Sequence, residues 1–160
     1  MNIHTQLIPA LTLALAGLML WVMFTDATRY TISNRVNMLI LALFGVAAIF
    51  LPVAWSALGA AAIFFAFGLG SFALGLMGGG DVKLLTVLTL WTGWSVATLN
   101  FFFLTAVFGG VLILIVLPLR WLAARRKNTE KPLPRILTRK EPVPYGLAIA
   151  MAFLWLLWID

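Results

Sequence analysis

The sequence predicts an all-α polytopic membrane protein in which six transmembrane helices form one domain. Of its 160 residues, 63% are hydrophobic and only 10% are charged, and the mean hydropathy is +1.07. Such a chain has too little polar surface to cover a water-soluble core. The only long polar stretch is residues 120–142. We therefore expect a single transmembrane domain over residues 1–160, with 120–142 as a basic cytoplasmic loop within it.

Six apolar runs define the expected helices. They cover residues 7–25, 38–55, 57–77, 82–94, 96–119 and 145–158. A helix needs about 20 residues to cross the hydrocarbon core of a bilayer, so the fourth run is short. We place its boundary with the fifth at the turn-forming cluster of residues 91–94. The first run is a retained helix rather than a signal peptide, because residues 1–10 contain no Lys or Arg.

The basic residues predict the topology. All eleven Lys and Arg fall in the connections after the first, third and fifth helices, and eight of them lie in residues 120–140. By the positive-inside rule these connections face the cytoplasm, and both termini lie outside. Tryptophans gather at the expected outer helix ends, as an interfacial belt requires: these are Trp55, Trp91, Trp94, Trp155 and Trp158.

Two of the five acidic residues stand apart from the rest. Glu130 and Glu141 lie in the basic loop and Asp160 is the last residue, whereas Asp26 and Asp81 each lie at the end of an apolar run. The predicted topology places both of these aspartates on the cytoplasmic side. An ionisable side chain at the edge of the hydrocarbon layer is costly, which indicates a functional role.

Two neighbouring carboxyl groups suit peptide hydrolysis. They cannot both ionise easily, so one keeps a proton while the other acts as a base. The ionised group would activate water, and the protonated group would donate to the carbonyl oxygen and then to the leaving amine. Gly78, Gly79 and Gly80 precede Asp81. Because three glycines form a poor helix, we expect non-helical backbone here, with Gly78 and Gly80 letting an extended substrate approach.

The motifs around both aspartates resemble those of the type IV prepilin peptidases. Residues 78–85, GGGDVKLL, resemble the Gly-x-Gly-Asp site of that family, and residues 142–148 resemble the start of its last helix. The motif of its first aspartate is matched by Asp26, Arg29, Ile32 and Asn34. Ser33 stands where the family usually has proline. The chain has no Cys, so it resembles the short, peptidase-only TadV/CpaA-like branch that serves Flp/Tad pili.

This resemblance implies a membrane aspartic endopeptidase of the bacterial cytoplasmic (inner) membrane. Its substrate would be a Flp-type or type IV-like prepilin, whose short leader is cleaved at the cytoplasmic face by Asp26 and Asp81. No cofactor is expected. The sequence does not identify the individual prepilin or the oligomeric state.

Three polar residues near the aspartates are candidates for a supporting role. Lys83 could hold Asp81 ionised or anchor the chain at lipid phosphate, and both interpretations stay open. Arg29 and Asn34 could order the loop after Asp26. Positive-inside topology explains Arg29 equally well, and Asn34 is a candidate N-cap of the second helix.

The basic loop favours contact with anionic lipid over a nucleic-acid or peptide site. No metal site is expected, because the chain lacks Cys and its one histidine, His4, has no ligand partner nearby.

Two alternatives to a peptidase remain. A small proton-coupled transporter or channel could use both aspartates as a relay, although transporters usually place such acids near the midplane and show internal repeats. A non-catalytic pilus-assembly scaffold would keep the fold, but it would not need both aspartates.

Overall fold

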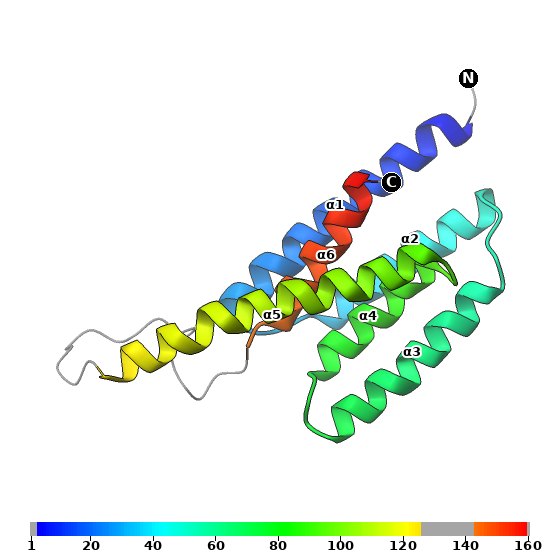
Figure 1. The fold of residues 1–160 in the computed structure, drawn as a ribbon. Coiled ribbons are helices and arrows are strands. Elements are labelled where there is room, and N and C mark those ends of the chain that lie inside the picture. The colour runs from blue at the N-terminus through cyan, green and yellow to red at the C-terminus, as the bar shows by residue number, and fades with distance from the viewer. Residues whose placement is uncertain (1–2, 126–142, 160) are drawn as a thin grey trace.

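The computed structural model describes residues 3–125 and 143–159, and this part of the chain is helical throughout apart from short connections (Figure 1). The helices are α1 (Ile3–Arg29), α2 (Asn34–Phe50), α3 (Ser56–Ala73), α4 (Gly79–Thr92), α5 (Val96–Arg125) and α6 (Tyr145–Ile159). The predicted all-helical class is confirmed, and each of the six apolar runs corresponds to one helix.

Three of these helices are long and apolar enough to cross a membrane. The candidate spans are Gln6–Arg29, Ser56–Ala73 and Val96–Ala123, while α2 and α6 are apolar but shorter. Many large apolar side chains point outward, among them Leu13 and Ile49 at 73% and 77% exposure. An apolar exterior of this extent suits contact with lipid rather than with water. The six-crossing topology with both termini outside stays a prediction.

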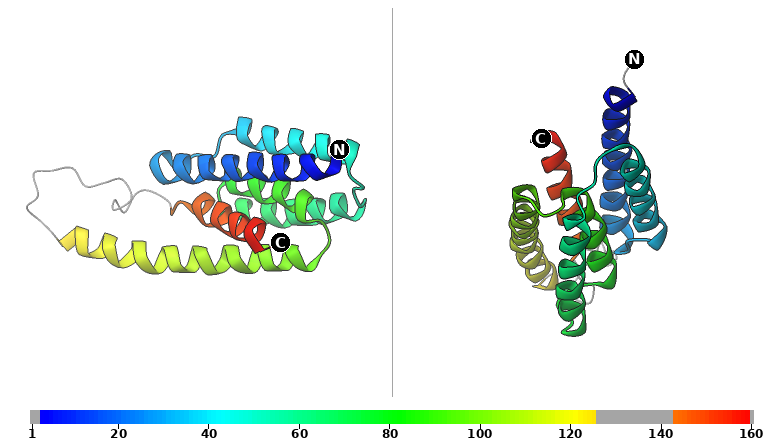
Figure 2. Two further views of the ribbon diagram at one scale, coloured as in Figure 1. Left: turned by 90° about the horizontal axis from the view of Figure 1, so that it is seen from above. Right: turned by 90° about the vertical axis from the view of Figure 1, so that its right-hand side faces the viewer.

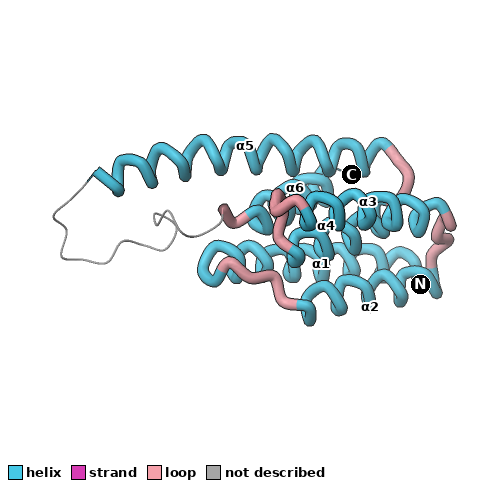
Figure 3. The backbone as a smooth tube through the Cα atoms, turned by 90° about the horizontal axis from the view of Figure 1, so that it is seen from below, coloured by secondary structure: helices cyan, strands magenta, loops and turns pink. Residues whose placement is uncertain are grey.

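Two short helices lie at the centre of the arrangement. Helix α4 contacts α2, α3, α5 and α6, and α6 contacts α1, α4 and α5. The two views in Figure 2 show α6 close to both α1 and α5. Helix α5 runs along one side of the bundle and extends past it (Figure 3). The end that it overhangs is the end where α1 finishes and α6 begins (Figure 2).

A continuous hydrophobic core holds α4 and α6 in place. Its fully buried side chains come from five helices: Met19, Val22, Ile40, Leu84, Leu88, Phe101, Ile149 and Phe153. The rings of Phe101 and Phe153 meet edge to face, with their centroids 5.6 Å apart, a favourable aromatic geometry. The core therefore fixes the starts of α4 and α6 relative to the end of α1.

The start of α2 differs from the predicted one for a local reason. The helix begins at Asn34, because Ser33 acts as its N-cap and accepts a hydrogen bond from the N–H of Val36 at 3.3 Å. The expectation that Asn34 is the cap is therefore wrong. Serine caps a helix in a way that proline cannot, so Ser33 orders this turn. The helix ends at Phe50, two residues before Pro52, in keeping with the restriction that proline imposes.

The glycine triplet is more helical than predicted. Gly78 is the N-cap of α4 with φ −73°, and Gly79 and Gly80 form its first turn. The left-handed conformation falls earlier, at Gly75 with φ +71°, where the chain leaves α3. The predicted turn at residues 91–94 is confirmed, since α4 ends at Thr92 and Gly93 has φ +63°.

Helix α5 is longer than predicted. It continues through Arg125, so the first six residues of the predicted basic loop are helical. The segment from 119 to 125 consists mainly of Leu, Ala and Arg, which are strong helix formers. The remaining residues of that loop, 126–142, lie outside the described part of the chain.

The topology predicts a clear result for reporter fusions. A fusion after Asp160 should report a periplasmic position and a fusion near Asn128 a cytoplasmic one, because all Lys and Arg lie in alternate connections. A fusion in the connection between α2 and α3 serves as a second periplasmic control. The opposite pattern of alkaline phosphatase and green fluorescent protein signals would overturn the topology.

Candidate active site

Asp26 lies in the last turn of α1 and is bound to the first turn of α6. Its side chain is only 4% exposed, and its Oδ2 accepts a hydrogen bond from the N–H of Leu147 at 3.0 Å. The backbone N–H of Gly146 also donates to this carboxylate. The first N–H groups of a helix have no partner within the helix. Asp26 therefore caps a helix that begins more than a hundred residues later in the chain.

Asp81 occupies a similar environment in α4. It is the third residue of the helix, and its Oδ2 accepts a hydrogen bond from the N–H of Gly78, the N-cap residue, at 3.2 Å. Both carboxylates thus lie at helix N-termini, where free N–H groups and the helix dipole stabilise negative charge. Two different helix starts, those of α4 and α6, hold the two acids.

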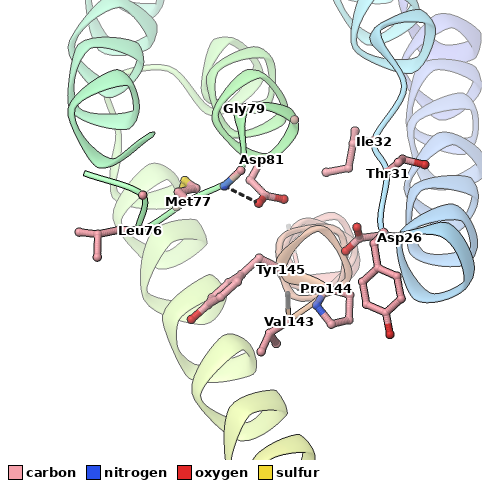
Figure 4. A pocket seen from close by; sticks show the side chains of 14 residues that line it. Asp26, Thr31, Ile32, Leu76, Met77, Gly79, Asp81, Val143, Pro144 and Tyr145 are labelled. Atoms are coloured by element: carbon pink, nitrogen blue, oxygen red, sulfur yellow. Dashed lines mark hydrogen bonds between the residues drawn. The ribbon is translucent and has the colours of Figure 1, made fainter. Parts of the chain in front are cut away.

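The two carboxyl groups face one cavity of about 590 Å³. Figure 4 shows them on opposite sides of an opening near the first turn of α6, with the glycine turn on the Asp81 side. They are close enough to interact electrostatically. The lining residues are Asp26, Tyr30, Thr31, Ile32, Gly75, Leu76, Met77, Gly78, Gly79, Gly80, Asp81, Val143, Pro144 and Tyr145. The structure therefore brings together both aspartates with Gly78 and Gly80.

Close packing gives the three glycines of the triplet different roles. A Cβ added to Gly78 would lie 2.9 Å from Oδ2 of Asp81, and one added to Gly80 would lie 3.2 Å from Cβ of Ile32. At Gly79 the nearest atom would be a ring carbon of Phe72 at 3.4 Å, an ordinary contact. Gly78 and Gly80 therefore pack more closely against their neighbours than Gly79 does. Neither residue has a positive φ, so close packing and not a left-handed conformation is the reason for glycine at these positions.

The three proposed supporting residues lie outside the cavity. The ammonium group of Lys83 donates a hydrogen bond to Oδ1 of Asn34 at 3.0 Å, so Lys83 links α4 to the start of α2. Arg29 is exposed and lines a separate surface hollow together with Arg35. Lys83 and Asn34 therefore form a structural link between two helices, and Arg29 lines a hollow other than the one that both aspartates line.

Gly146 is a site residue that the sequence reasoning missed. A Cβ there would lie 2.9 Å from both Cγ and Oδ2 of Asp26, and 2.6 Å from Cδ1 of Ile32. Only glycine fits at this point in the first turn of α6. The signal for it was its place in the motif of residues 142–148, but nothing in that motif indicated contact with Asp26.

Tyr30, a second missed residue, ends α1 in an uncommon conformation. Its φ is +55°, which is rare for a bulky side chain. Its N–H donates to the carbonyl oxygen of Asp26 at 3.0 Å. The backbone that carries Asp26 is therefore turned sharply at the edge of the cavity. No sequence signal marks Tyr30 for a left-handed conformation.

The described residues contain no group of three or more His, Asp or Glu side chains that could hold a metal ion. The cavity is lined by two carboxyl groups, each of which accepts a hydrogen bond from the N-terminal backbone of a helix. Two carboxyl groups that share a site are suited to acid–base chemistry.

Comparison with known families places the chain in one of them. The type IV leader peptidase family matches residues 13–114, and the chain belongs to this family. The matched segment includes both Asp26 and Asp81. Comparisons with curated proteins and with solved structures gave no match.

The glycine contacts predict an order of sensitivity within the triplet. Gly78→Ala and Gly80→Ala should lose activity at near-normal membrane abundance, because a methyl group would displace Asp81 or Ile32, and about 1 Å of misplacement can cost on the order of 100-fold in rate. Gly79→Ala should retain most activity. The measurement is prepilin cleavage at equal enzyme abundance, with Gly110→Ala as the control, since nothing lies within 4 Å of a Cβ there. Greatest damage from Gly79→Ala would contradict the assignment.

Proposed function

We propose that this member of the type IV leader peptidase family is an aspartic endopeptidase that removes the leader from a prepilin. The observation that carries the proposal is the cavity in which Asp26 and Asp81, brought from two different helices, face each other beside the glycine turn. The family supplies the protease class, and the carboxyl pair supplies a reaction mechanism without a covalent intermediate.

In the proposed mechanism the pair holds one proton between its two carboxyl groups. Like charges at close range disfavour double ionisation, so the pair titrates as a unit. Each carboxylate has its Oδ2 engaged by backbone N–H groups, and we assign the remaining oxygens to the catalytic water and the substrate. The hydrogen bonds fix the direction in which each carboxyl group presents its free oxygen, which is the pre-organisation that proton transfer needs.

Hydrolysis then proceeds in two proton-coupled steps. The ionised carboxylate takes a proton from water as the water oxygen attacks the scissile carbonyl carbon. The protonated carboxyl group donates its proton to the carbonyl oxygen. When the tetrahedral intermediate collapses, the carboxyl group that took the proton from water gives it to the leaving amine and the C–N bond breaks. The other carboxylate recovers its proton from a hydroxyl group of the intermediate. Both carboxyl groups return to their starting state.

The glycine turn supports a peptide as the substrate. Gly78, Gly79 and Gly80 offer backbone without side chains along one wall of the cavity, so an extended chain can lie close to Asp81. The cavity volume of about 590 Å³ falls in the range of about 300–1,000 Å³ typical of ligand sites. That space suits a short peptide segment.

Charged residues beside both aspartates favour a site at the cytoplasmic face. Arg29 follows Asp26 by less than one helical turn, and Lys83 follows Asp81 by two residues in α4. By the positive-inside rule these cations mark the cytoplasmic interface of the bacterial inner membrane. We assign a Flp-type or type IV-like prepilin as the substrate through the TadV/CpaA-like motifs, and anionic lipid as the partner of the basic loop.

A proton relay for transport has less support. Asp26 and Asp81 both lie at helix ends, whereas a relay across the membrane needs acids near its midplane. Replacement of the aspartates distinguishes a peptidase from a scaffold, because a scaffold would tolerate loss of either acid.

Replacement of either aspartate by asparagine should abolish leader removal. Asparagine keeps an oxygen that can accept the N–H groups of Gly78 or Leu147, so the fold should persist. Loss of general acid–base catalysis should lower cleavage by at least about 100-fold. The readout is the mobility shift of a co-expressed prepilin on a gel, normalised to enzyme abundance in the membrane.

Asp160→Asn is the matched control, because it makes the same chemical change at the end of the chain. It should cleave at the wild-type rate. Robust processing by either the Asp26→Asn or the Asp81→Asn protein would overturn the proposed function.

A further inference from the structure

Ile32 is wedged between the starts of the two helices that hold the catalytic pair. It lies in the loop between α1 and α2, and its side chain extends toward α4 close to the first turn of α6 (Figure 4). Its Cβ would meet a Cβ added to Gly80 at 3.2 Å, and its Cδ1 would meet one added to Gly146 at 2.6 Å. The two ends of one side chain thus touch two separate helices.

Each of these contacts leads directly to one aspartate. Gly80 immediately precedes Asp81 in α4. Gly146 lies against the carboxyl group of Asp26 and donates a backbone hydrogen bond to it. A shift of Ile32 would therefore be transmitted to both carboxyl groups through the backbone of α4 and α6.

The loop that carries Ile32 is fixed at both ends. On one side the N–H of Tyr30 bonds to the carbonyl oxygen of Asp26 at 3.0 Å. On the other side Ser33 caps α2. Ile32 also packs against the hydrophobic core, and a β-branched side chain has few χ1 rotamers available. These constraints make Ile32 a stiff element rather than an adaptable one.

We propose that Ile32 is a positioning residue that sets the separation between the carboxyl groups of Asp26 and Asp81, with Gly80 and Gly146 as its two contact points. The proposal rests on the proposed function for its catalytic meaning, but the separation itself can be measured without any activity. Close-packed interiors transmit changes of a single methylene, so the length of this side chain determines how near the two helix starts approach.

Kinetics test the catalytic consequence. Ile32→Val removes only Cδ1, the atom against Gly146, and Ile32→Ala removes Cγ1 and Cγ2 as well. We expect a graded fall in kcat, reaching about 10- to 100-fold for Ile32→Ala, since misplacement by about 1 Å can cost on the order of 100-fold. KM should change little, because the substrate contacts remain. A rise in KM with kcat unchanged would assign Ile32 to substrate binding and overturn the proposal.

The pH profile of kcat separates positioning from mere loss of stability. The interaction between the two carboxyl groups depends on their separation, and it sets how far apart the two apparent pKa values of the pair lie. Ile32→Ala should therefore change the pH interval between the acid and the alkaline limb of the kcat profile. Ile40→Ala is the matched control, because Ile40 is fully buried in the same core and does not line the cavity. It should lower protein abundance and leave the profile unchanged. Identical profiles for all three proteins would contradict the proposal.

Cross-linking measures the separation directly. Because the chain has no Cys, a Thr31→Cys/Met77→Cys protein carries only two introduced thiols, one on each side of the cavity (Figure 4), and both aspartates stay in place. With bifunctional thiol reagents of graded length, adding Ile32→Ala should shift the most efficient reagent to a shorter one. An unchanged length preference would overturn the positioning role. Failure of the wild-type protein to cleave any prepilin would refute the proposed function while leaving this measurement valid.

Discussion

The hydrogen bonds from the first turn of α6 to Asp26 are the interaction on which the site depends. They join the first helix of the bundle to the last. Because α6 also packs on α4, the same contact places the start of α4, and with it Asp81, near Asp26. The position of one acid therefore fixes the position of the other. The carboxylate to which we assign a part in the chemistry also joins two helices of the bundle.

The N-termini of α4 and α6 stabilise the two carboxylates of the site. A carboxylate at the edge of a hydrocarbon layer loses much of its hydration, and the described residues provide no Lys or Arg ion pair to Asp26 or Asp81. Each is compensated instead by N–H groups that would otherwise lack partners. Neither carboxylate then needs a neighbouring cation. In the proposed mechanism a nearby Lys or Arg would favour the ionised form of both acids, and the pair would lose the proton that it shares.

The sequence predicted the six helices well, because hydropathy along the chain directly reflects the local constraint that lipid imposes. It also placed both aspartates and Gly78 and Gly80 together. It could not predict the contacts of Ile32 with Gly80 and Gly146, which depend on packing between segments far apart in the chain. The errors in helix boundaries had local causes. Ser33 caps α2, so that helix begins at Asn34. Asp81 accepts a hydrogen bond from the N–H of Gly78, which stabilises a helical first turn that includes Gly79 and Gly80.

The shortness of α4 has a consequence for how water and a lipid-bound peptide meet. Its 14 residues extend about 21 Å at 1.5 Å per residue, less than the roughly 30 Å of hydrocarbon in a bilayer. Helix α5 is more than twice as long and extends past the end of the bundle where α4 begins (Figure 2). The beginning of α4 is therefore recessed relative to the end of α5. In the proposed topology, this recess would open to the cytoplasm and let water reach the cavity below the membrane surface. A substrate helix could remain in lipid while only its cytoplasmic end unwinds into that recess, which avoids the cost of extracting its apolar residues.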